Sequence, residues 1–205
     1  KINKYPIAQY NANGSILRDL PLNAGIKGDI DILLSKNNIL TNLPLPKVSP
    51  KKIPEKNRTD LTSQPSLLFK SWESPKAPSL PALFAQPYEG GTRIWLHSPT
   101  VAERLNIGGR LDEYLNERGE VLCLGNDWVE FLNESLNNAS EFKQNEVSNA
   151  LTLIIDINGK GKITDWTFTL SRIKPINIIN PKHLQTVNKR KSTSKSIPIA
   201  IKPIK

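Results

Sequence analysis

The feature that most constrains the fold is a stretch of 25 residues, 149–173, with the sequence NALTLIIDINGKGKITDWTFTLSRI. On each side of its Asn158-Gly159 pair, apolar residues alternate with other residues. Alternation with a period of two is typical of a β-strand with one buried face. Asn-Gly supplies the positive-φ positions of a tight turn. The stretch therefore predicts a β-hairpin with one buried face, formed by Leu151, Leu153, Ile155, Ile157, Trp166, Phe168 and Leu170.

Two shorter strands are predicted earlier in the chain. Residues 67–72 are a short apolar run, and residues 92–97 alternate, with Ile94 and Leu96 on one face. The turn signal Tyr-Glu-Gly-Gly stands just before the second run. We therefore expect the two strands to be neighbours that are joined by a long excursion.

Three helices are predicted between these strands and the hairpin. The Ser-Pro pair at 98–99 is typical of an N-cap followed by a first helical position, and the Gly-Gly pair at 108–109 would end that short helix. Residues 111–122 place Leu111, Leu115, Arg118 and Leu122 on one face. Residues 127–136 space apolar side chains in the same way and predict the third helix.

The N-terminal part is interpreted as a small β element followed by a linker. Ile30, Ile32 and Leu34 alternate with other residues, and the Asn pair at 37–38 can turn the chain, which predicts a β-hairpin within residues 1–45. Residues 46–66 are rich in Pro and Lys and show no periodicity. Such a composition is typical of a disordered linker.

Charge is distributed unevenly along the chain. Residues 1–88 carry twelve Lys/Arg against six Asp/Glu, residues 89–171 carry seven against thirteen, and residues 172–205 carry nine against none. Basic arms often contact phosphate backbones, although solvated linkers have the same composition, and that alternative stays open. We treat residues 174–205 as a basic arm whose candidate nucleic-acid-binding residues are Lys189, Arg190, Lys191 and Lys195.

Several classes of protein do not fit this sequence. No apolar run is long enough to span a bilayer, and the first residues lack the pattern of a signal peptide. The single cysteine, Cys123, forms no internal disulfide and is expected to be a buried thiol, and two histidines make no metal cluster. We therefore expect a cytoplasmic protein without a membrane partner. Because the sequence has no Met, we also expect native residues upstream of Lys1.

The order of these elements resembles the opening part of the RNB catalytic domain of the RNase II and RNase R exoribonucleases. The matching residues are WLHSP at 95–99, Leu111-Asp112 and Arg118-Gly119, and the tail looks most like a cyanobacterial branch. The resemblance covers roughly residues 67–205, with residues 67–173 as the N-terminal part of an RNB-like domain. It implies an α+β fold: an RNB-like mixed β-sheet with short helices, preceded by the small β segment and the disordered linker.

The resemblance also implies where the chemistry of the family would lie. In that family aspartates of one loop bind Mg²⁺, which draws charge from the scissile phosphate and activates water. Here the loop positions hold Glu73, Lys76, Ser79, Pro81 and Ala82, so one carboxylate remains. A family aspartate is replaced by Thr100, and a family tyrosine by Cys123. We therefore predict no catalytic residue, no metal ligand and no cofactor in this chain.

Two functions from different classes follow. In the first, the chain is an RNase II-type 3′→5′ exoribonuclease homologue that acts on or binds single-stranded RNA and is catalytically degenerate; whether it is an enzyme stays open. In the second, it is a non-catalytic RNA- or protein-binding module with basic arms. A truncated product without an independent function is a third possibility. We expect His97 to be a hydrogen-bonded structural residue, and Trp72, Trp95, Trp128 and Trp166 to pack in the core rather than stack on bases.

Overall fold

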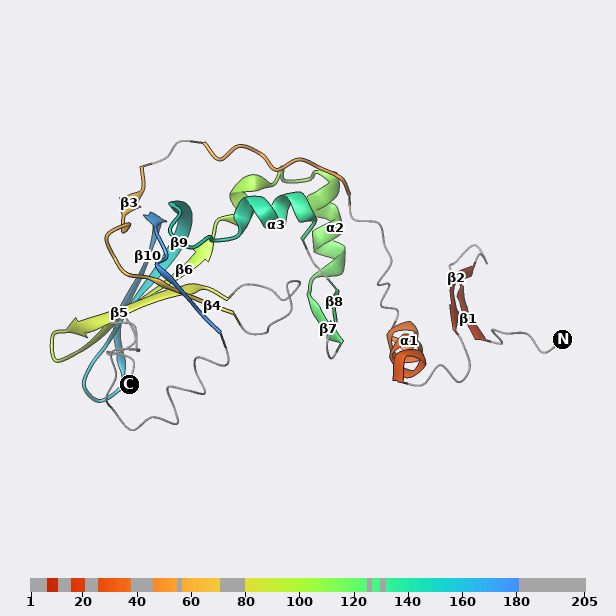
Figure 1. Cartoon of the computed structure of the whole chain (residues 1–205), viewed down its shortest axis with the longest axis horizontal. Coiled ribbons are helices and arrows are strands. Elements are labelled where there is room, and N and C mark those ends of the chain that lie inside the picture. The colour runs from red at the N-terminus through yellow and green to blue at the C-terminus, as the bar shows by residue number, and fades with distance from the viewer. Residues whose placement is uncertain are drawn as a thin grey trace. The chain divides into compact units, whose positions relative to one another are not determined.

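The computed structural model divides the chain into two compact units, Lys1–Pro44 and Leu45–Lys205. Figure 1 shows the helices and strands of each unit. The structure describes residues 7–10, 16–20, 26–37, 46–54, 57–70, 80–124, 127–129 and 132–180.

The first unit contains a short hairpin and a helix. Strands β1 (Ile7–Tyr10) and β2 (Ile16–Leu20) pair antiparallel, and α1 (Ile26–Lys36) follows. The β-hairpin predicted around the 37–38 pair is therefore wrong, because its first strand is helical. The same apolar residues that alternate also recur every four positions, at 26, 30 and 34, which is a helical spacing. Asn37 ends the helix, and its side-chain amide donates to the Leu33 carbonyl at 2.8 Å.

The second unit is built on a mixed seven-stranded sheet with the order β11-β4-β5-β6-β9-β10-β3 (Figure 1). The two outer pairs, β11–β4 and β10–β3, are parallel, and the other neighbours are antiparallel. This confirms the predicted mixed α+β fold. The strands are β3 (Thr59–Asp60), β4 (Leu67–Phe69), β5 (Ala82–Tyr88), β6 (Gly91–Pro99), β9 (Ser148–Ile157), β10 (Ile163–Ile173) and β11 (Asn177–Ile179).

The predicted hairpin is confirmed as β9 and β10, but its buried face is the opposite one. Positive φ falls at Gly161, and the Asn158 carboxamide oxygen accepts from the backbone N–H groups of Lys160 and Lys162 in the turn. The fully buried residues of the hairpin are Ala150, Thr152, Ser171 and Ile173. Large apolar residues of the other face are exposed: Leu151 by 40%, Phe168 by 56% and Trp166 by 60%. Alternation identifies two faces, but the rest of the fold decides which one is covered.

Strand β5 was not predicted, and it separates two strands expected to be neighbours. It pairs with β4 on one side and with β6 on the other. Pro81 and Pro87 obscure its pattern, since proline is rare inside sheets. Glu89 and Gly90, both with positive φ, form the tight turn between β5 and β6. Gly91 follows, where an added Cβ would lie 1.9 Å from the Ile157 carbonyl oxygen, so β6 approaches β9 closely only with glycine.

Of the three helices predicted in this region, only the second forms largely as predicted. The amphipathic helix is confirmed as α2 (Arg110–Arg118), which ends at left-handed Gly119. The helix predicted after 98–99 is a single turn, η1 (Val101–Arg104), because β6 continues through Pro99. The third helix, α3 (Glu134–Ser140), begins late, after the N-cap residue Asn133, whose side chain accepts from the Leu136 N–H at 2.8 Å. Residues 127–129 instead form β8 (Asp127–Val129), paired with β7 (Leu122–Leu124).

Two hydrophobic clusters hold the second unit together. One lies on a face of the sheet and the other lies between α2 and α3. The sheet cluster consists of Leu61, Leu67, Leu68, Ala82, Phe84, Trp95, Phe142, Ala150, Ile173 and Ile179. The helical cluster is centred on Leu111, Leu115 and Leu136, with Val48, Val101, Leu105, Tyr114 and Leu132 packed around it.

The described part of residues 46–66 packs against the fold, so the prediction of a disordered linker is wrong there. The Asn133 amide donates to the Pro46 carbonyl at 2.9 Å, and the Lys51 N–H donates to the Arg104 carbonyl at 2.8 Å. Arg58, whose side chain is 2% exposed, forms an ion pair of 2.7 Å with Glu103. A proline-rich segment can thus be ordered by contacts that its own periodicity does not reveal.

Candidate functional site

The ends of the loop that should carry the family's acids lie close together in the sheet. The Lys70 N–H donates to the Ile179 carbonyl at 2.9 Å, and the Leu80 N–H donates to the Phe69 carbonyl at 3.3 Å. Residues 71–79, including Glu73, Lys76 and Ser79, lie outside the described residues. The described residues on either side therefore place the two ends of the loop at the end of β4 and before the start of β5, with the first end beside β11.

The two other loop positions have different surroundings. Ala82 is fully buried in the sheet cluster and pairs with His97 across β5 and β6, so a carboxylate at this position would lie in the hydrophobic core. Pro81 is exposed. At Ala82, therefore, an acid could not reach a metal site without a change in the strand.

A small pocket of about 170 Å³ lies beside the loop ends. Its lining is mostly apolar and includes one carboxylate, that of Glu141, against the two ammonium groups of Lys70 and Lys143. Mg²⁺ requires several oxygen ligands and is repelled by neighbouring cations. In the part of the chain that the structure describes, no group of three or more His, Cys, Asp or Glu residues is placed to hold a metal ion.

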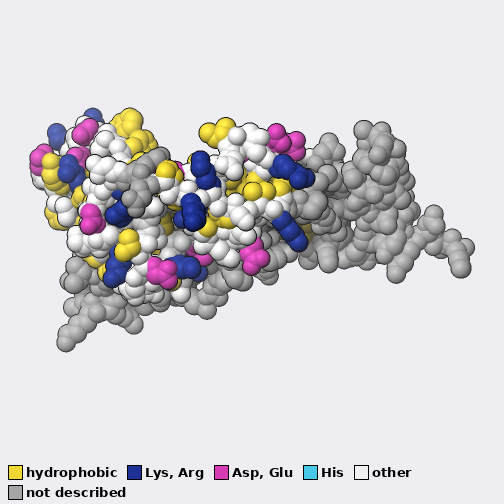
Figure 2. All heavy atoms as spheres, turned by 90° about the horizontal axis from the view of Figure 1, so that it is seen from above, with side chains coloured by type: hydrophobic (Ala, Val, Ile, Leu, Met, Phe, Trp, Pro, Cys, Tyr) yellow, Lys and Arg dark blue, Asp and Glu magenta, His cyan; other side chains and the backbone are white. Residues whose placement is uncertain are grey.

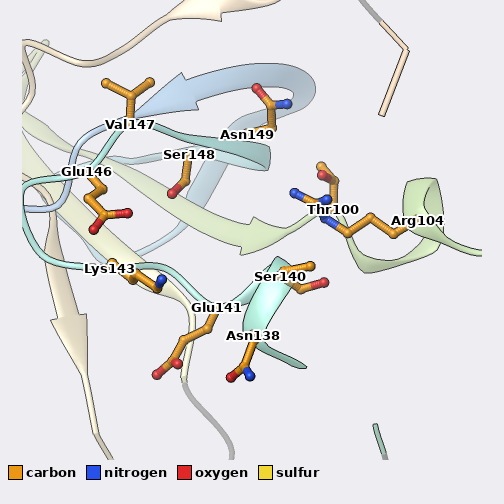
Figure 3. A pocket seen from close by; sticks show the side chains of 11 residues that line it. Thr100, Arg104, Asn138, Ser140, Glu141, Lys143, Glu146, Val147, Ser148 and Asn149 are labelled. Atoms are coloured by element: carbon orange, nitrogen blue, oxygen red, sulfur yellow. The ribbon is translucent and has the colours of Figure 1, made fainter. Parts of the chain in front are cut away.

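A second pocket, of about 250 Å³, lies on the other side of Glu141 and Lys143 (Figure 3). Figure 3 shows Arg104 reaching toward Thr100, the position of a family aspartate, at the end of β6. The remaining side chains come from the end of α3, from the segment after it and from the first residues of β9, and they are Asn138, Ala139, Ser140, Glu141, Lys143, Glu146, Val147, Ser148 and Asn149.

The chemistry of this second pocket is polar and balanced in charge. It combines two cations, Arg104 and Lys143, with two carboxylates, Glu141 and Glu146, and several hydroxyl and amide groups. The Ser140 Oγ is buried and has no hydrogen-bond partner. Such a lining suits hydrogen bonding to a polar ligand such as a sugar-phosphate chain, and it lacks the excess of acids needed to concentrate a metal ion.

His97 has the structural role that its position in a strand predicted. It is fully buried, with Nε2 3.2 Å from the Ser66 Oγ and Nδ1 2.8 Å from the Thr152 Oγ1. The Thr152 Oγ1 in turn lies 2.5 Å from the Ser171 Oγ. Burial lowers the pKa of His97 to about 4, because the charged imidazolium would lose its hydration. The ring is therefore neutral at physiological pH and ties three strands to the loop before β4.

The other residues singled out in the sequence are placed as follows. Cys123 is exposed in β7, so the expectation of a buried thiol is wrong. Trp95 is in the core as predicted, but Trp166 is exposed, which contradicts the expectation for that residue. Trp72 and the four cations of the basic arm, Lys189, Arg190, Lys191 and Lys195, lie outside the described residues.

The two pockets were missed by sequence reasoning because their residues are distant in the chain. Arg104 belongs to a turn after β6, whereas Lys143 and Glu146 belong to the segment before β9. No short motif joins them. On the face shown in Figure 2, Lys and Arg side chains are interspersed with Asp and Glu side chains, so charge alone does not mark a binding site on that face.

Comparison with protein families matches residues 58–204 to the family described as the RNB domain. Among solved structures, the chain resembles Mycoplasma genitalium RNase R in complex with double-stranded RNA, with a TM-score of 0.72 and 17% identity over 88% of this chain and 34% of that chain. It also resembles the same organism's RNase R in complex with ribose methylated single-stranded RNA, with a TM-score of 0.71 and 17% identity over 91% of this chain and 31% of that chain.

A third similar structure is that of yeast Ssd1, described as a pseudonuclease, with a TM-score of 0.73 and 18% identity over 88% of this chain and 24% of that chain. At these identities the likeness concerns the fold. The chain spans about a third or less of the length of these solved relatives. No curated protein matches it.

Proposed function

Because the chain belongs to the RNB domain family, we propose that it is an RNase II-type homologue that binds single-stranded RNA without cleaving it. The observation that carries this proposal is the pocket beside the ends of the loop that corresponds to the family's acidic loop, because its lining has two lysines and only one carboxylate. Phosphoryl transfer of the family's kind depends on a bound metal ion to neutralise charge. This lining disfavours such an ion.

The proposal of RNA binding is supported by the fold and by the charges. Two similar structures are RNase R proteins in complex with RNA, and a third is named a pseudonuclease. We propose that Arg104 and Lys143 contact the sugar-phosphate chain in the polar pocket, and that Lys189, Arg190, Lys191 and Lys195 add non-specific contacts to phosphates. No helix in the described ranges is long and apolar enough to cross a membrane.

The first test separates binding from cleavage. The full chain is incubated with a labelled single-stranded RNA of about twenty nucleotides, with Mg²⁺ or with EDTA, and both anisotropy and release of nucleoside monophosphates are followed. We expect binding in both conditions and no release in either. Mg²⁺-dependent release that disappears in Glu73→Gln would overturn the proposal, because a metal site would then exist.

The second test concerns the location of the RNA. Arg104→Gln and Lys143→Gln should each weaken binding and lower the slope of log affinity against log salt by about one per lost phosphate contact. The exposed Lys160→Gln serves as a control, because Lys160 lies outside the basic arm and does not line either pocket. Changing the four cations of the basic arm to Ala together should reduce the salt slope further. Affinity that stays flat from low to high salt would contradict the proposal.

A further inference from the structure

The outer half of the β9–β10 hairpin is uncovered on both faces. All residues from 161 to 168 are exposed, including Trp166 and Phe168, whose rings pack edge to face with centroids 5.7 Å apart. Ile163 on the same face is 62% exposed. An exposed apolar surface of this kind on a folded domain usually marks a contact with another molecule.

The outer edge of β10 is also open over this stretch. Strand β3 pairs only with Ser171 and Arg172, so the described residues offer no strand neighbour to residues 163–170 on that edge. Proteins normally protect such an edge with Lys, Pro or a short strand. The stretch ITDWTFTL contains no Lys and no Pro. Its backbone N–H and C=O groups are therefore available to a further strand.

The chemistry of this face favours a protein partner over RNA. The residues of β6, β9 and β10 on the same face as Trp166 and Phe168 are mostly aliphatic. The one cation among them, Arg172, lies opposite Asp60 in the register of β10 and β3, at the inner end of the hairpin. Surfaces that bind nucleic acids are rich in Lys and Arg. Centres of protein interfaces are instead poor in charge and rich in aromatic residues.

We propose that two copies of this chain pair through β10, antiparallel about a two-fold axis at Thr167. Among the described residues, the stretch without a strand neighbour on the outer edge runs from Ile163 to Leu170, and Thr167 lies near its centre. In this register Thr167 faces its own counterpart, and Trp166 of each copy faces Phe168 of the other. Asp165 faces Thr169 of the other copy, so no like charges are opposed. The strand is thus complementary to itself, as a two-fold interface requires.

The expected interface is small. Aromatic side chains bury about 150–250 Å² each, so four rings that are a little over half exposed contribute roughly 350–600 Å². Specific stable interfaces bury about 1,200–2,000 Å² in total. Backbone pairing adds to the aromatic area but keeps the total near the low end. We therefore expect a dimer that dissociates on dilution.

A charge-swap experiment at the axis tests the register. Sedimentation of the full chain is measured over a concentration series for wild type, Thr167→Lys and Thr167→Glu. Residues opposed across an antiparallel pair have Cβ atoms about 5 Å apart, so like charges at the axis should keep each variant monomeric. An equimolar mixture of the two variants should recover a dimer. Asn116→Lys, at an exposed position in α2, should behave as wild type.

Four outcomes would overturn the proposal. These are a wild-type chain that is monomeric at every concentration, a Thr167→Lys variant that still dimerises, a mixture that stays monomeric, and a surface that binds RNA instead. The last would appear as quenching of fluorescence by a single-stranded oligonucleotide that is lost in Trp166→Phe. As a second variant, Trp166→Ala with Phe168→Ala should weaken the dimer at least tenfold while circular dichroism stays unchanged. None of these measurements depends on the proposed RNA-binding function.

Discussion

The inner and outer halves of the β9–β10 hairpin have the same alternating pattern but opposite surroundings. In the inner half, small and polar residues such as Thr152 and Ser171 are fully buried, while in the outer half Trp166 and Phe168 are exposed. The difference arises from distant segments: the loop before β4 supplies Ser66 to His97, and the segment after α3 supplies Phe142 to the core. Burial along a strand is therefore decided by what the rest of the chain brings to it.

The largest expected effect is at Gly91, where β6 packs against the β9 strand of the outer half. In Gly91→Ala, the new Cβ would lie 1.9 Å from the Ile157 carbonyl oxygen, so β6 and β9 must separate. We expect a loss of about 4 kcal/mol or more in the free energy of unfolding, measured by urea denaturation. The control is Gly90→Ala, where the added Cβ meets nothing within 4 Å and only positive φ opposes it, for a cost of about 1 kcal/mol. Equal losses in both variants would contradict this account.

The next effect concerns the buried network of the inner half and depends on pH. The pKa of His97 is about 4 in the folded protein and 6.5 in a free side chain, so the unfolded chain binds a proton first as pH falls. Stability from this group is complete above pH 6.5 and declines from there toward pH 4, by up to about 3 kcal/mol. The measurement is urea denaturation between pH 4 and 8, compared with His97→Gln. The variant should lose this part of the pH dependence; an unchanged slope would show that His97 is not the group responsible.

A smaller loss is expected from a single hydroxyl in the same network. Thr152→Val removes the atom that bridges the His97 Nδ1 and the Ser171 Oγ, leaving buried polar groups with fewer partners. The expected cost is about 2 kcal/mol in the free energy of unfolding. The matched control is Thr167→Val on the exposed outer half, which should change it by less than about 0.5 kcal/mol. The comparison of the two halves fails if both substitutions cost the same.

The smallest effect is expected for the aromatic residue of the outer half. Trp166→Ala removes a side chain that is 60% exposed together with its edge-to-face contact with Phe168, so the free energy of unfolding should fall by about 1 kcal/mol in dilute solution. Thermal unfolding at low protein concentration is the measurement. A large loss at a concentration where the chain is monomeric would mean that this half is covered within one copy.

Local patterns predicted the elements whose stability is local, and they failed where long-range contacts decide. The β9–β10 hairpin and α2 follow from period and turn residues close in the chain. Segment 26–36 fits both a period of two and a spacing of four, and the helix prevails. The N-terminal half of the helix predicted at 127–136 was lost because residues 127–129 pair with β7, which its apolar spacing does not show.

The candidate site was predictable only in part. The loop positions that lack acids were found because the family resemblance places them within one short stretch of the sequence, residues 73–82. The polar pocket was not, since Arg104, Lys143 and Glu146 meet only after η1 and the segment before β9 fold against each other. The burial of His97 and its contact with Ser66 also depend on segments 31 residues apart, which no periodicity connects.

The contacts of residues 46–54 have a practical consequence for where the domain can be cut. The family match begins at residue 58, yet Val48 packs on the helical cluster and the Asn133 amide donates to the carbonyls of Pro46 and Val48. A fragment that starts at the family boundary would uncover Leu136 and strip the amide at the start of α3 of its acceptors. The smallest piece that keeps these contacts should accordingly begin near residue 45, about a dozen residues before the start of the family match.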